Sequence, residues 1–308
     1  MRVIRAEVMG LCFGVRDALE VIDRVEEPAT VTIYGQLVHN EIVQTQLEAR
    51  GFALRSEAHR GDSLPETPAV LVTAHGISDR ERERLVSAGK RLVDTTCPLV
   101  MRAHQAARNL QAEGYHVLVI GRRGHVEVEG IVGDLAHYDV IESADEVAVY
   151  PHRRLGIVCQ TTATECRVER IRAAIVERNP DAEIQFVDTV CLPTKEHQRA
   201  LERLLDRVDA VVIVGGHHSN NTRELVARCR ERGKPALHVQ SAAELDTAWL
   251  KGFATVGLTA GTSTLPDTID EIHRALARIG SDCSGFEIPD SGLEIADSKF
   301  PVPDSQVR

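Results

Sequence analysis

One cysteine in each third of the chain stands between an extended apolar segment and a helical pattern. The three stretches are Gly10-Leu11-Cys12-Phe13-Gly14, Asp94-Thr95-Thr96-Cys97-Pro98 and Asp188-Thr189-Val190-Cys191-Leu192-Pro193. The second and third share the pattern Asp-Thr-x-Cys. The distance between these motifs is longer than the roughly 20 to 50 residues of a solenoid repeat, so it indicates a repeat of domain size. The chain is therefore expected to fold into three similar α/β units that each carry one cysteine.

The order of elements after each cysteine also repeats. A helical pattern comes first, then a buried strand, then a polar loop, as the spacing of the apolar residues indicates. The loop contains a histidine 27, 28 and 27 residues after the cysteine, at His39, His125 and His218. Because these offsets match, we interpret the three histidine loops as equivalent parts of one repeated unit.

The third pass lacks a closing strand, whereas the chain begins with a strand, residues 2–9, that belongs to no complete unit. We expect this strand to complete the third sheet. The predicted architecture is an α/β trefoil of three small parallel sheets around a pseudo-threefold axis. Its units are residues 12–96, residues 97–190, and residues 191–280 together with the N-terminal strand 1–11; residues 281–308, rich in Ser, Asp and Pro, are expected to be a disordered tail.

The loops that bind ligands in open parallel sheets lie at the carboxyl ends of the strands. All three cysteines and all three histidine loops follow predicted strands. The sequence therefore predicts that they converge on one central cleft.

Composition excludes several classes of function. The formal charge is −10, and no basic stripe with interleaved aromatic residues suggests nucleic acid as a partner. No apolar run approaches the roughly 18 residues that span a bilayer, and charged residues interrupt the N-terminal stretch. Seven cysteines in 308 residues are too sparse for the disulfide framework of a small secreted domain. We therefore expect a cytoplasmic protein without a membrane or nucleic-acid partner.

Three thiolates that converge on an axis can coordinate one metal centre. A structural zinc site usually takes paired ligands from a short Cys-x2-Cys knuckle, which the sequence lacks. Three isolated cysteines suit a cubane iron-sulfur cluster with one open iron, and each would sit at a helix N-terminus, which favours an anionic group. The alternative is that all three are buried packing residues, the common role of free cysteine.

The loops around the expected centre supply hydrogen-bond donors that suit a phosphate or diphosphate. They are His39, His75, His125, Thr161, Ser219, Asn220, Asn221 and Ser263. Glu127, two residues after His125, is the carboxylate placed to move protons. Beside a buried anionic centre its pKa should be raised, as a general acid requires.

These residues resemble the 4-hydroxy-3-methylbut-2-enyl diphosphate reductase family of the methylerythritol phosphate pathway of isoprene biosynthesis. The resemblance covers residues 1 to about 280. Its carriers are Leu11-Cys12-Phe13-Gly14-Val15, Val38-His39-Asn40, Ala74-His75-Gly76, Asp94-Thr95-Thr96-Cys97-Pro98-Leu99-Val100, Gly124-His125-Val126-Glu127-Val128-Glu129-Gly130, Gln160-Thr161-Thr162 and Thr259-Ala260-Gly261.

The resemblance implies an iron-sulfur oxidoreductase with one [4Fe-4S] cluster ligated by Cys12, Cys97 and Cys191. It implies that the hydroxyl of 4-hydroxy-3-methylbut-2-enyl diphosphate binds the open iron and leaves as water, with a proton relayed through Glu127. Two electrons from a ferredoxin or flavodoxin arrive one at a time, and the products are isopentenyl and dimethylallyl diphosphate. Thr161 would lie beside the hydroxyl and Glu127. The diphosphate would be held by His39, His75, His125, Ser219, Asn220, Asn221 and Ser263.

The third unit departs from the family pattern. Where the family has Gly-Ser-x-Asn-Ser-Ser-Asn-Ser, this chain has Gly215-Gly216-His217-His218-Ser219-Asn220-Asn221-Thr222, so Asn220 replaces a serine. Lys195-Glu196-His197 stands where the family has an uncharged run and an arginine. Two alternatives to the reductase therefore stay open. One is a paralogue that reduces a related phosphorylated allylic alcohol in specialised metabolism, and the other is a non-catalytic phosphate-binding metal sensor.

Overall fold

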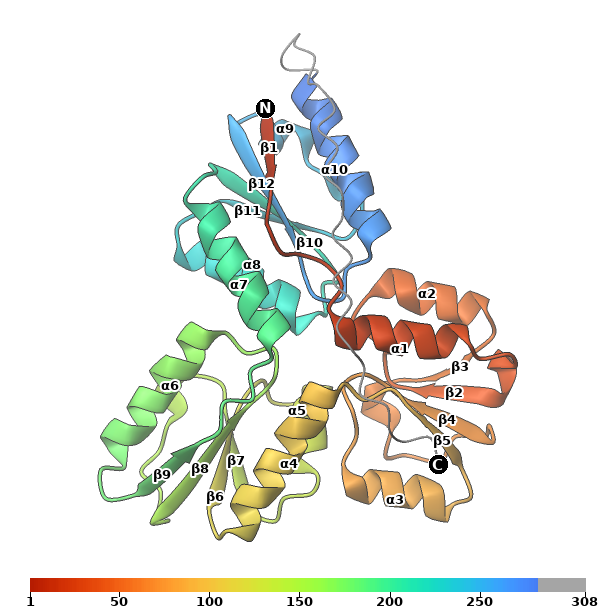
Figure 1. Cartoon of the computed structure of the whole chain (residues 1–308), viewed down its shortest axis with the longest axis vertical. Coiled ribbons are helices and arrows are strands. Elements are labelled where there is room, and N and C mark those ends of the chain that lie inside the picture. Colours follow the sequence, from red (N-terminus) through yellow and green to blue (C-terminus); the bar gives the residue numbers. More distant parts are fainter. Residues whose placement is uncertain (282–308) are drawn as a thin grey trace, which may run out of the picture.

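The computed structural model describes residues 1–281, and its elements form three units around a common centre (Figure 1). Each unit is built on one parallel sheet of four strands. The first sheet consists of β2 (Val31–Tyr34), β3 (Ala53–Arg55), β4 (Ala69–Val72) and β5 (Arg91–Asp94). The second consists of β6 (His116–Ile120), β7 (Tyr138–Ile141), β8 (Arg154–Cys159) and β9 (Glu183–Phe186). The third consists of β10 (Ala210–Val214), β11 (Ala236–Val239), β12 (Thr255–Ala260) and β1 (Arg2–Arg5).

All three sheets have the same strand order. It is β3-β2-β4-β5 in the first, β7-β6-β8-β9 in the second and β11-β10-β12-β1 in the third. The first and third strands of each unit lie side by side at the centre of the sheet, and their connections run in opposite directions from there. Such a topological switch point is where open α/β sheets bind ligands. The three parallel sheets that the sequence predicts are therefore present, and each contributes one switch point.

The edge strands β3, β7 and β11 are absent from the elements predicted from the sequence, which left their segments as connections. They are only three or four residues long and are largely exposed or half-buried. An edge strand of this kind has no continuous apolar run, so the pattern that reveals the central strands is missing.

The N-terminal strand β1 pairs with β12 in the sheet formed by the last third of the chain. The register runs from Arg2 opposite Thr255 to Arg5 opposite Leu258. Beyond the strand, the backbone N–H of Cys12 donates to the carbonyl of Thr262 at 3.0 Å. The observed strand ends at Arg5 and is therefore shorter than the predicted strand 2–9.

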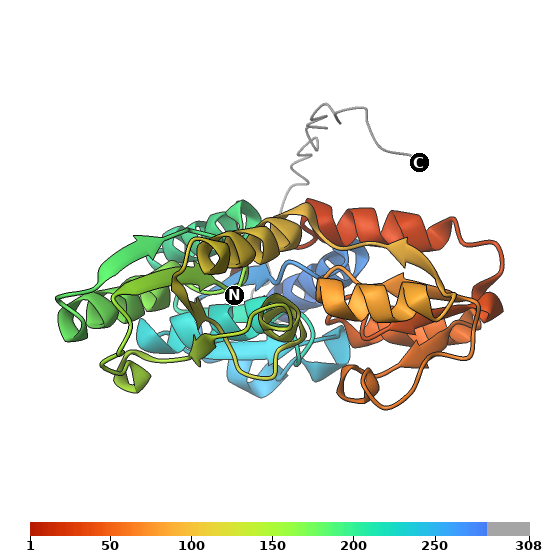
Figure 2. The same ribbon diagram turned by 90° about the horizontal axis from the view of Figure 1, so that it is seen from below.

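Three helices begin directly after the three cysteines, and Figure 2 shows them in one layer on the same side of the molecule. They are α1 (Phe13–Asp23), α4 (Pro98–Ala112) and α7 (Leu192–Leu205). The other helices are α2 (Glu41–Ala49), α3 (Asp79–Ser87), α5 (Val126–Val132), α6 (Glu165–Arg178), α8 (Asn220–Glu231), α9 (Thr247–Leu250) and α10 (Pro266–Ser281). Short 3₁₀ helices occupy Pro28–Thr30, Glu57–His59, Ala144–Glu146 and Ala242–Glu244.

The hydrophobic core lies on both faces of the central strands, as expected for parallel sheets covered by helices. Every residue of β2, β4 and β10 is buried. The packing of these strands fixes the loops at their carboxyl ends. No helix among residues 1–281 is long and apolar enough to cross a membrane. The unit boundaries at residues 12, 97 and 191 remain predictions, and the expected tail lies outside the described residues.

Candidate active site at the centre of the three units

The three cysteines occupy equivalent positions at the start of helices. Cys12, Cys97 and Cys191 are the N-cap residues of α1, α4 and α7. Each follows the last strand of its sheet in spatial order, namely β1, β5 and β9. Backbone N–H groups of the first helical turn donate to each sulfur and lower the pKa of its thiol. The helix N-termini therefore stabilise negative charge at all three sulfurs, as the sequence predicts.

Burial acts in the opposite direction on these thiols and has the larger effect. It raises the pKa of Cys97 to about 11 and that of Cys191 to about 12, and it raises the pKa of Cys12 as well. Without a cation between them, the three side chains are therefore neutral thiols at neutral pH. A metal centre would displace the protons, since a coordinated thiol is deprotonated.

Gly14 shows how closely the first turn of α1 approaches Cys97. A Cβ at this position would lie 2.5 Å from Sγ of Cys97 and 3.1 Å from its Cβ. Such distances leave no space for any side chain, so helix α1 can begin here only with glycine in its first turn. Cys12, Cys97 and Cys191 also line one cavity, and three soft sulfur donors that face one space suit an iron-sulfur cluster held by three cysteines.

The loops that follow the first strand of each unit share a helix cap. The side chains of Asn40, His125 and Ser219 are the N-caps of α2, α5 and α8, and each accepts a backbone N–H of its helix. All three lie 28 residues after the cysteine of their unit. This register corrects the equivalence inferred for the histidines: His125 matches Asn40 and Ser219, whereas His39 and His218 precede their caps. His218 is exposed.

Three imidazole rings nevertheless meet at the centre, because His75 takes the place expected for His218. His39 stacks on His75 with a centroid distance of 4.2 Å. His125 approaches the two rings edge-on, at 5.2 Å from His39 and 5.9 Å from His75. The first unit therefore supplies two of the three imidazole rings, and the second unit supplies one.

These rings are neutral at neutral pH. Burial lowers the pKa of His39 to about 4 and that of His125 to about 3, and it lowers the pKa of His75 well below its usual value. Nδ1 of His125 accepts the N–H of Glu127 at 3.2 Å, so its proton lies on Nε2. That Nε2 atom is buried and has no hydrogen-bond partner among residues 1–281, as is true of Nε2 of His39 and Nδ1 of His75. The unused ring nitrogens suit an anion that would also raise the pKa of each ring.

Glu127 is 1% exposed and lies in the first turn of α5. Its Oε1 accepts the backbone N–H of Thr161 at 2.6 Å, and the hydroxyl of Thr161 also hydrogen-bonds to the carboxyl group. Burial raises the pKa of Glu127 to about 7, and the two hydrogen bonds from Thr161 oppose this shift. A carboxyl group with this pKa is suited to donate a proton near neutral pH.

The third unit supplies uncharged donors. Asn221 Oδ1 accepts the N–H of Thr262 at 3.1 Å, while its Nδ2 is buried without a partner in the described chain. Asn220 Nδ2 donates to Oγ1 of Thr162 at 2.9 Å and so links the third unit to the second. The hydroxyl of Ser263 donates to the carbonyl of His39 at 3.3 Å.

All of the site residues predicted from the sequence line one cavity. They are Cys12, His39, His75, Cys97, His125, Glu127, Thr161, Cys191, Ser219, Asn220, Asn221 and Ser263. Apolar side chains, among them Val15, Val38, Leu99 and Val100, line the rest of its wall. The cavity therefore combines polar groups suited to an anion with a surface suited to a short hydrocarbon. The role of each residue remains a prediction.

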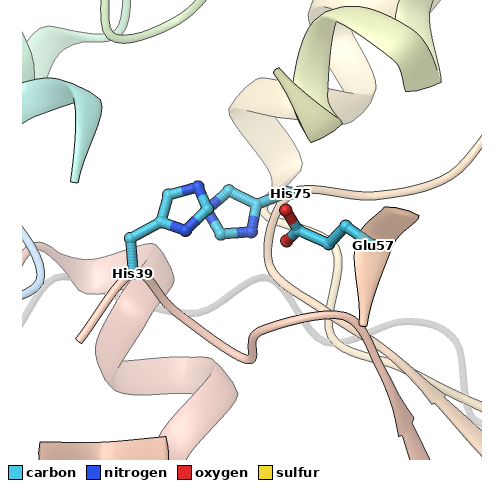
Figure 3. Close-up of side chains that lie close together, drawn as sticks. All are labelled: His39, Glu57 and His75. Carbon is cyan, nitrogen blue, oxygen red and sulfur yellow. The ribbon is translucent and has the colours of Figure 1, made fainter. Parts of the chain in front are cut away.

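Sequence reasoning missed Glu57, whose carboxylate lies beside two of the imidazoles (Figure 3). The ligand atoms of His39, Glu57 and His75 all lie within 4.8 Å of one another, a set of groups that also suits a divalent metal. Burial raises the pKa of Glu57, while the charge of Arg60 opposes this. Glu57 belongs to a polar connection in the sequence, where no motif marks it.

The departures after Cys191 have local structural roles. Nζ of Lys195 pairs with Oδ2 of Asp188 at 2.5 Å. The ring of His197 bridges the carbonyls of Pro193 and Gly10, at 2.7 and 3.0 Å. His197 therefore ties α7 to the segment that leads into Cys12, and neither residue lines the central cavity.

Known proteins are similar to this chain in both sequence and fold. A sequence model of the family described as LytB protein matches residues 3–277. The chain belongs to the LytB family. Two of its relatives, from Symbiobacterium thermophilum and Aquifex aeolicus, are named 4-hydroxy-3-methylbut-2-enyl diphosphate reductase. The first is 34% identical over 275 residues, which cover 86% of this chain and 92% of the relative. The second is 32% identical over 290 residues, which cover 92% and 97%.

Two solved structures extend the likeness to three dimensions. The E-1-hydroxy-2-methyl-but-2-enyl-4-diphosphate reductase from Plasmodium falciparum has a TM-score of 0.81 at 26% identity, and the match covers 89% of this chain and 87% of that one. A structure of (E)-4-hydroxy-3-methyl-but-2-enyl diphosphate reductase has a TM-score of 0.63 at 30% identity, and the match covers 90% and 100%. The three-sheet architecture is therefore that of the LytB family of diphosphate reductases.

Proposed function

We propose that this protein reduces 4-hydroxy-3-methylbut-2-enyl diphosphate to isopentenyl and dimethylallyl diphosphate. The observation that carries this proposal is the central cavity, in which a protonatable carboxyl group, three thiols and a set of phosphate-binding groups meet. The reaction breaks the C–O bond of the allylic alcohol and forms a C–H bond. It consumes two electrons and two protons and releases water.

Cys12, Cys97 and Cys191 would hold a [4Fe-4S] cluster. When bound, such a cluster supplies electrons one at a time and an iron with an open position for the substrate oxygen. The chain would need to supply no fourth ligand, because the fourth iron is left open for the substrate.

Glu127 would donate the proton that converts the leaving hydroxyl to water. Its raised pKa keeps it largely protonated up to about pH 7. Thr161 acts on Glu127 as a positioning residue, because its N–H fixes Oε1 at 2.6 Å. The carboxyl group can then keep its orientation while the proton moves.

The diphosphate would bind in the polar part of the cavity, among the donors that have no hydrogen-bond partner. The imidazoles of His39, His75 and His125 would contribute ring nitrogens. Ser219, Asn220, Asn221 and Ser263 would contribute hydroxyl and amide groups. The apolar wall would accept the five-carbon chain and exclude water from it.

One experiment tests this function directly. The protein is reconstituted anaerobically with iron and sulfide, then mixed with 4-hydroxy-3-methylbut-2-enyl diphosphate and a one-electron reductant while the products are followed. Isopentenyl and dimethylallyl diphosphate are expected. A protein with an intact cluster that yields neither product contradicts the proposal and favours the paralogue that reduces a related phosphorylated allylic alcohol. Purified protein that contains zinc and no iron contradicts both, and favours the metal sensor.

The electron donor, a ferredoxin or flavodoxin, would approach where the cysteines are nearest to exposed apolar side chains. Phe13 and Leu192 directly follow Cys12 and Cys191 and are 42% and 58% exposed. Leu192→Ser should lower turnover with a protein donor and leave turnover with a small chemical reductant unchanged. Val149→Ser, at another exposed apolar residue, is the matched control. An equal loss with both reductants would place the defect in the cluster.

A further inference from the structure

A second cavity adjoins the central one between the second and third units. Its volume is about 470 Å³, a size typical of small-molecule sites. The wall comes from the loop after β6, from α6, from α8 and from β11. Asn220 lines both cavities.

Four arginines line this second cavity. They are Arg122, Arg167, Arg223 and Arg230. Arg223 and Arg230 are seven residues apart on α8, which places both on one face of the helix. Besides burial, the charges of Arg122 and Arg223 lower the pKa of His125, so both arginines lie near the central cavity.

The carboxylates in the same wall neutralise only one of these four arginines. Glu224 Oε1 pairs with Nη1 of Arg167 at 2.7 Å. Glu142 Oε1 accepts the backbone N–H of Arg123 at 2.9 Å and lies 3.7 Å from its guanidinium group. Both carboxylates therefore already have a cation, and three guanidinium groups of the cavity are left without one.

The arginines on another face of α8 and at its C-terminal end behave differently. Arg228 pairs with Glu202 and Glu231, and Arg232 pairs with Asp206 at 3.0 Å. Within the described residues, by contrast, the guanidinium groups of Arg223 and Arg230 form no hydrogen bond or ion pair. The unpaired arginines are confined to the face of α8 that lines the cavity.

Arg167 adds a buried requirement for an acceptor. Its Nε and Nη2 atoms are buried and have no partner among residues 1–281. A buried donor without a partner is destabilising, and more so when it is charged. An anion in the cavity would satisfy both atoms, and arginine binds phosphate oxygens in this two-point manner.

We propose that this cavity is a second diphosphate-binding site, which the substrate occupies on its way to the central cavity. We call it the outer site and the central cavity the inner site. In a chain of formal charge −10, a local group of unpaired arginines attracts an anion that the protein as a whole repels. The diphosphate of the substrate binds here first and then passes Asn220. The choice of ligand rests on the proposed function, whereas the existence of an anion site does not.

Binding of inorganic diphosphate to the reconstituted full-length protein tests the proposal. Calorimetry is expected to resolve two sites. The double variant Arg223→Gln with Arg230→Gln should weaken binding at the outer site at least about tenfold. Each substitution removes a charged hydrogen bond between a guanidinium group and the diphosphate. Arg232→Gln removes the same charge from the residue that follows α8 and should retain both sites. His39→Ala should weaken the inner site and retain the outer one.

A single site in the unchanged protein, or two sites of unchanged affinity in the double variant, would overturn the proposal. An equal loss in Arg232→Gln would also overturn it, because the effect would then follow from net charge alone. Failure of the reductase assay leaves this result intact, since no turnover is measured. Thermal unfolding of each variant shows whether it is folded. We expect the double variant to fold, because Arg223 and Arg230 are exposed and unpaired.

Discussion

Helices α5 and α8 begin at equivalent positions of the second and third units, yet they carry different chemistry into the central cavity. Their caps are His125 and Ser219, each 28 residues after the cysteine of its unit. Two residues further on, the second unit has Glu127 and the third has Asn221. The corresponding residue of the first unit is Ile42. The repeat therefore fixes where a side chain enters, and only the second unit uses that position for a titratable group.

The largest effect is expected from removing this difference at Glu127. Glu127→Gln retains the shape of the side chain and removes its proton, so kcat should fall about 10²- to 10⁴-fold. Iron content should not change. Glu129→Gln, an exposed position on the same helix, is the matched control and should remain active. Turnover that survives Glu127→Gln would assign the proton to another group.

The pH dependence of kcat should report the same carboxyl group. Because burial raises the pKa of Glu127 to about 7, its proton is present below that pH and is lost above it. We expect kcat to be level below about pH 7 and to fall about tenfold per pH unit above it. Asn221 does not titrate and adds nothing to the profile. A kcat that rises through pH 7 would mean that the ionised form of the carboxyl group is the active one.

A second contrast lies two residues after each cysteine, where the units have Gly14, Leu99 and Pro193. In the first unit, a Cβ at Gly14 would meet the sulfur of Cys97, which belongs to another unit. Gly14→Ala should therefore lower iron content, and we expect the free energy of unfolding to fall by about 1–3 kcal/mol. Gly61→Ala, where a Cβ has no neighbour within 4 Å, is the control. Equal iron content in both variants would show that the cysteines can move apart.

The smallest effect concerns protons taken up with the anion. His125 is neutral in the protein, whereas a diphosphate beside its Nε2 raises its pKa. Binding of inorganic diphosphate near pH 6 should therefore take up a fraction of a proton. Calorimetry in buffers of different ionisation enthalpy measures this. His125→Asn should reduce the uptake, whereas Ser219→Ala in the third unit should weaken binding and leave the uptake per bound ligand unchanged.

The sequence predicts which residues line the central cavity, because the loops that carry them follow strands. Long apolar strands such as β6 and β10 reveal their carboxyl ends, and parallel strands bring those ends together. Errors arise where this signal is weak. The edge strands β3, β7 and β11 are short and only partly buried. His218 has the expected offset, but the helix cap that sets the register is Ser219.

Other features depend on contacts that no local pattern encodes. Glu57 reaches the imidazoles from a connection whose sequence contains no motif. The second cavity joins Arg122 after β6, Arg167 on α6 and Arg223 on α8, which are far apart in the chain. Each arginine alone resembles an ordinary surface residue. Only the fold shows that they face one space and that neighbours such as Arg123 and Arg232 already have partners.

The pairing of β1 with β12 has a consequence for how the protein is made. Cys12 leaves the ribosome early, yet the strand before it needs β12 as a neighbour, and its own N–H needs the carbonyl of Thr262. The first ligand of the expected cluster is therefore fixed only after nearly all of the described chain has been synthesised. If the expected cluster binds, its loading would test whether the chain is complete to the last sheet, because a chain truncated before that sheet has two positioned cysteines and leaves Cys12 without its anchor.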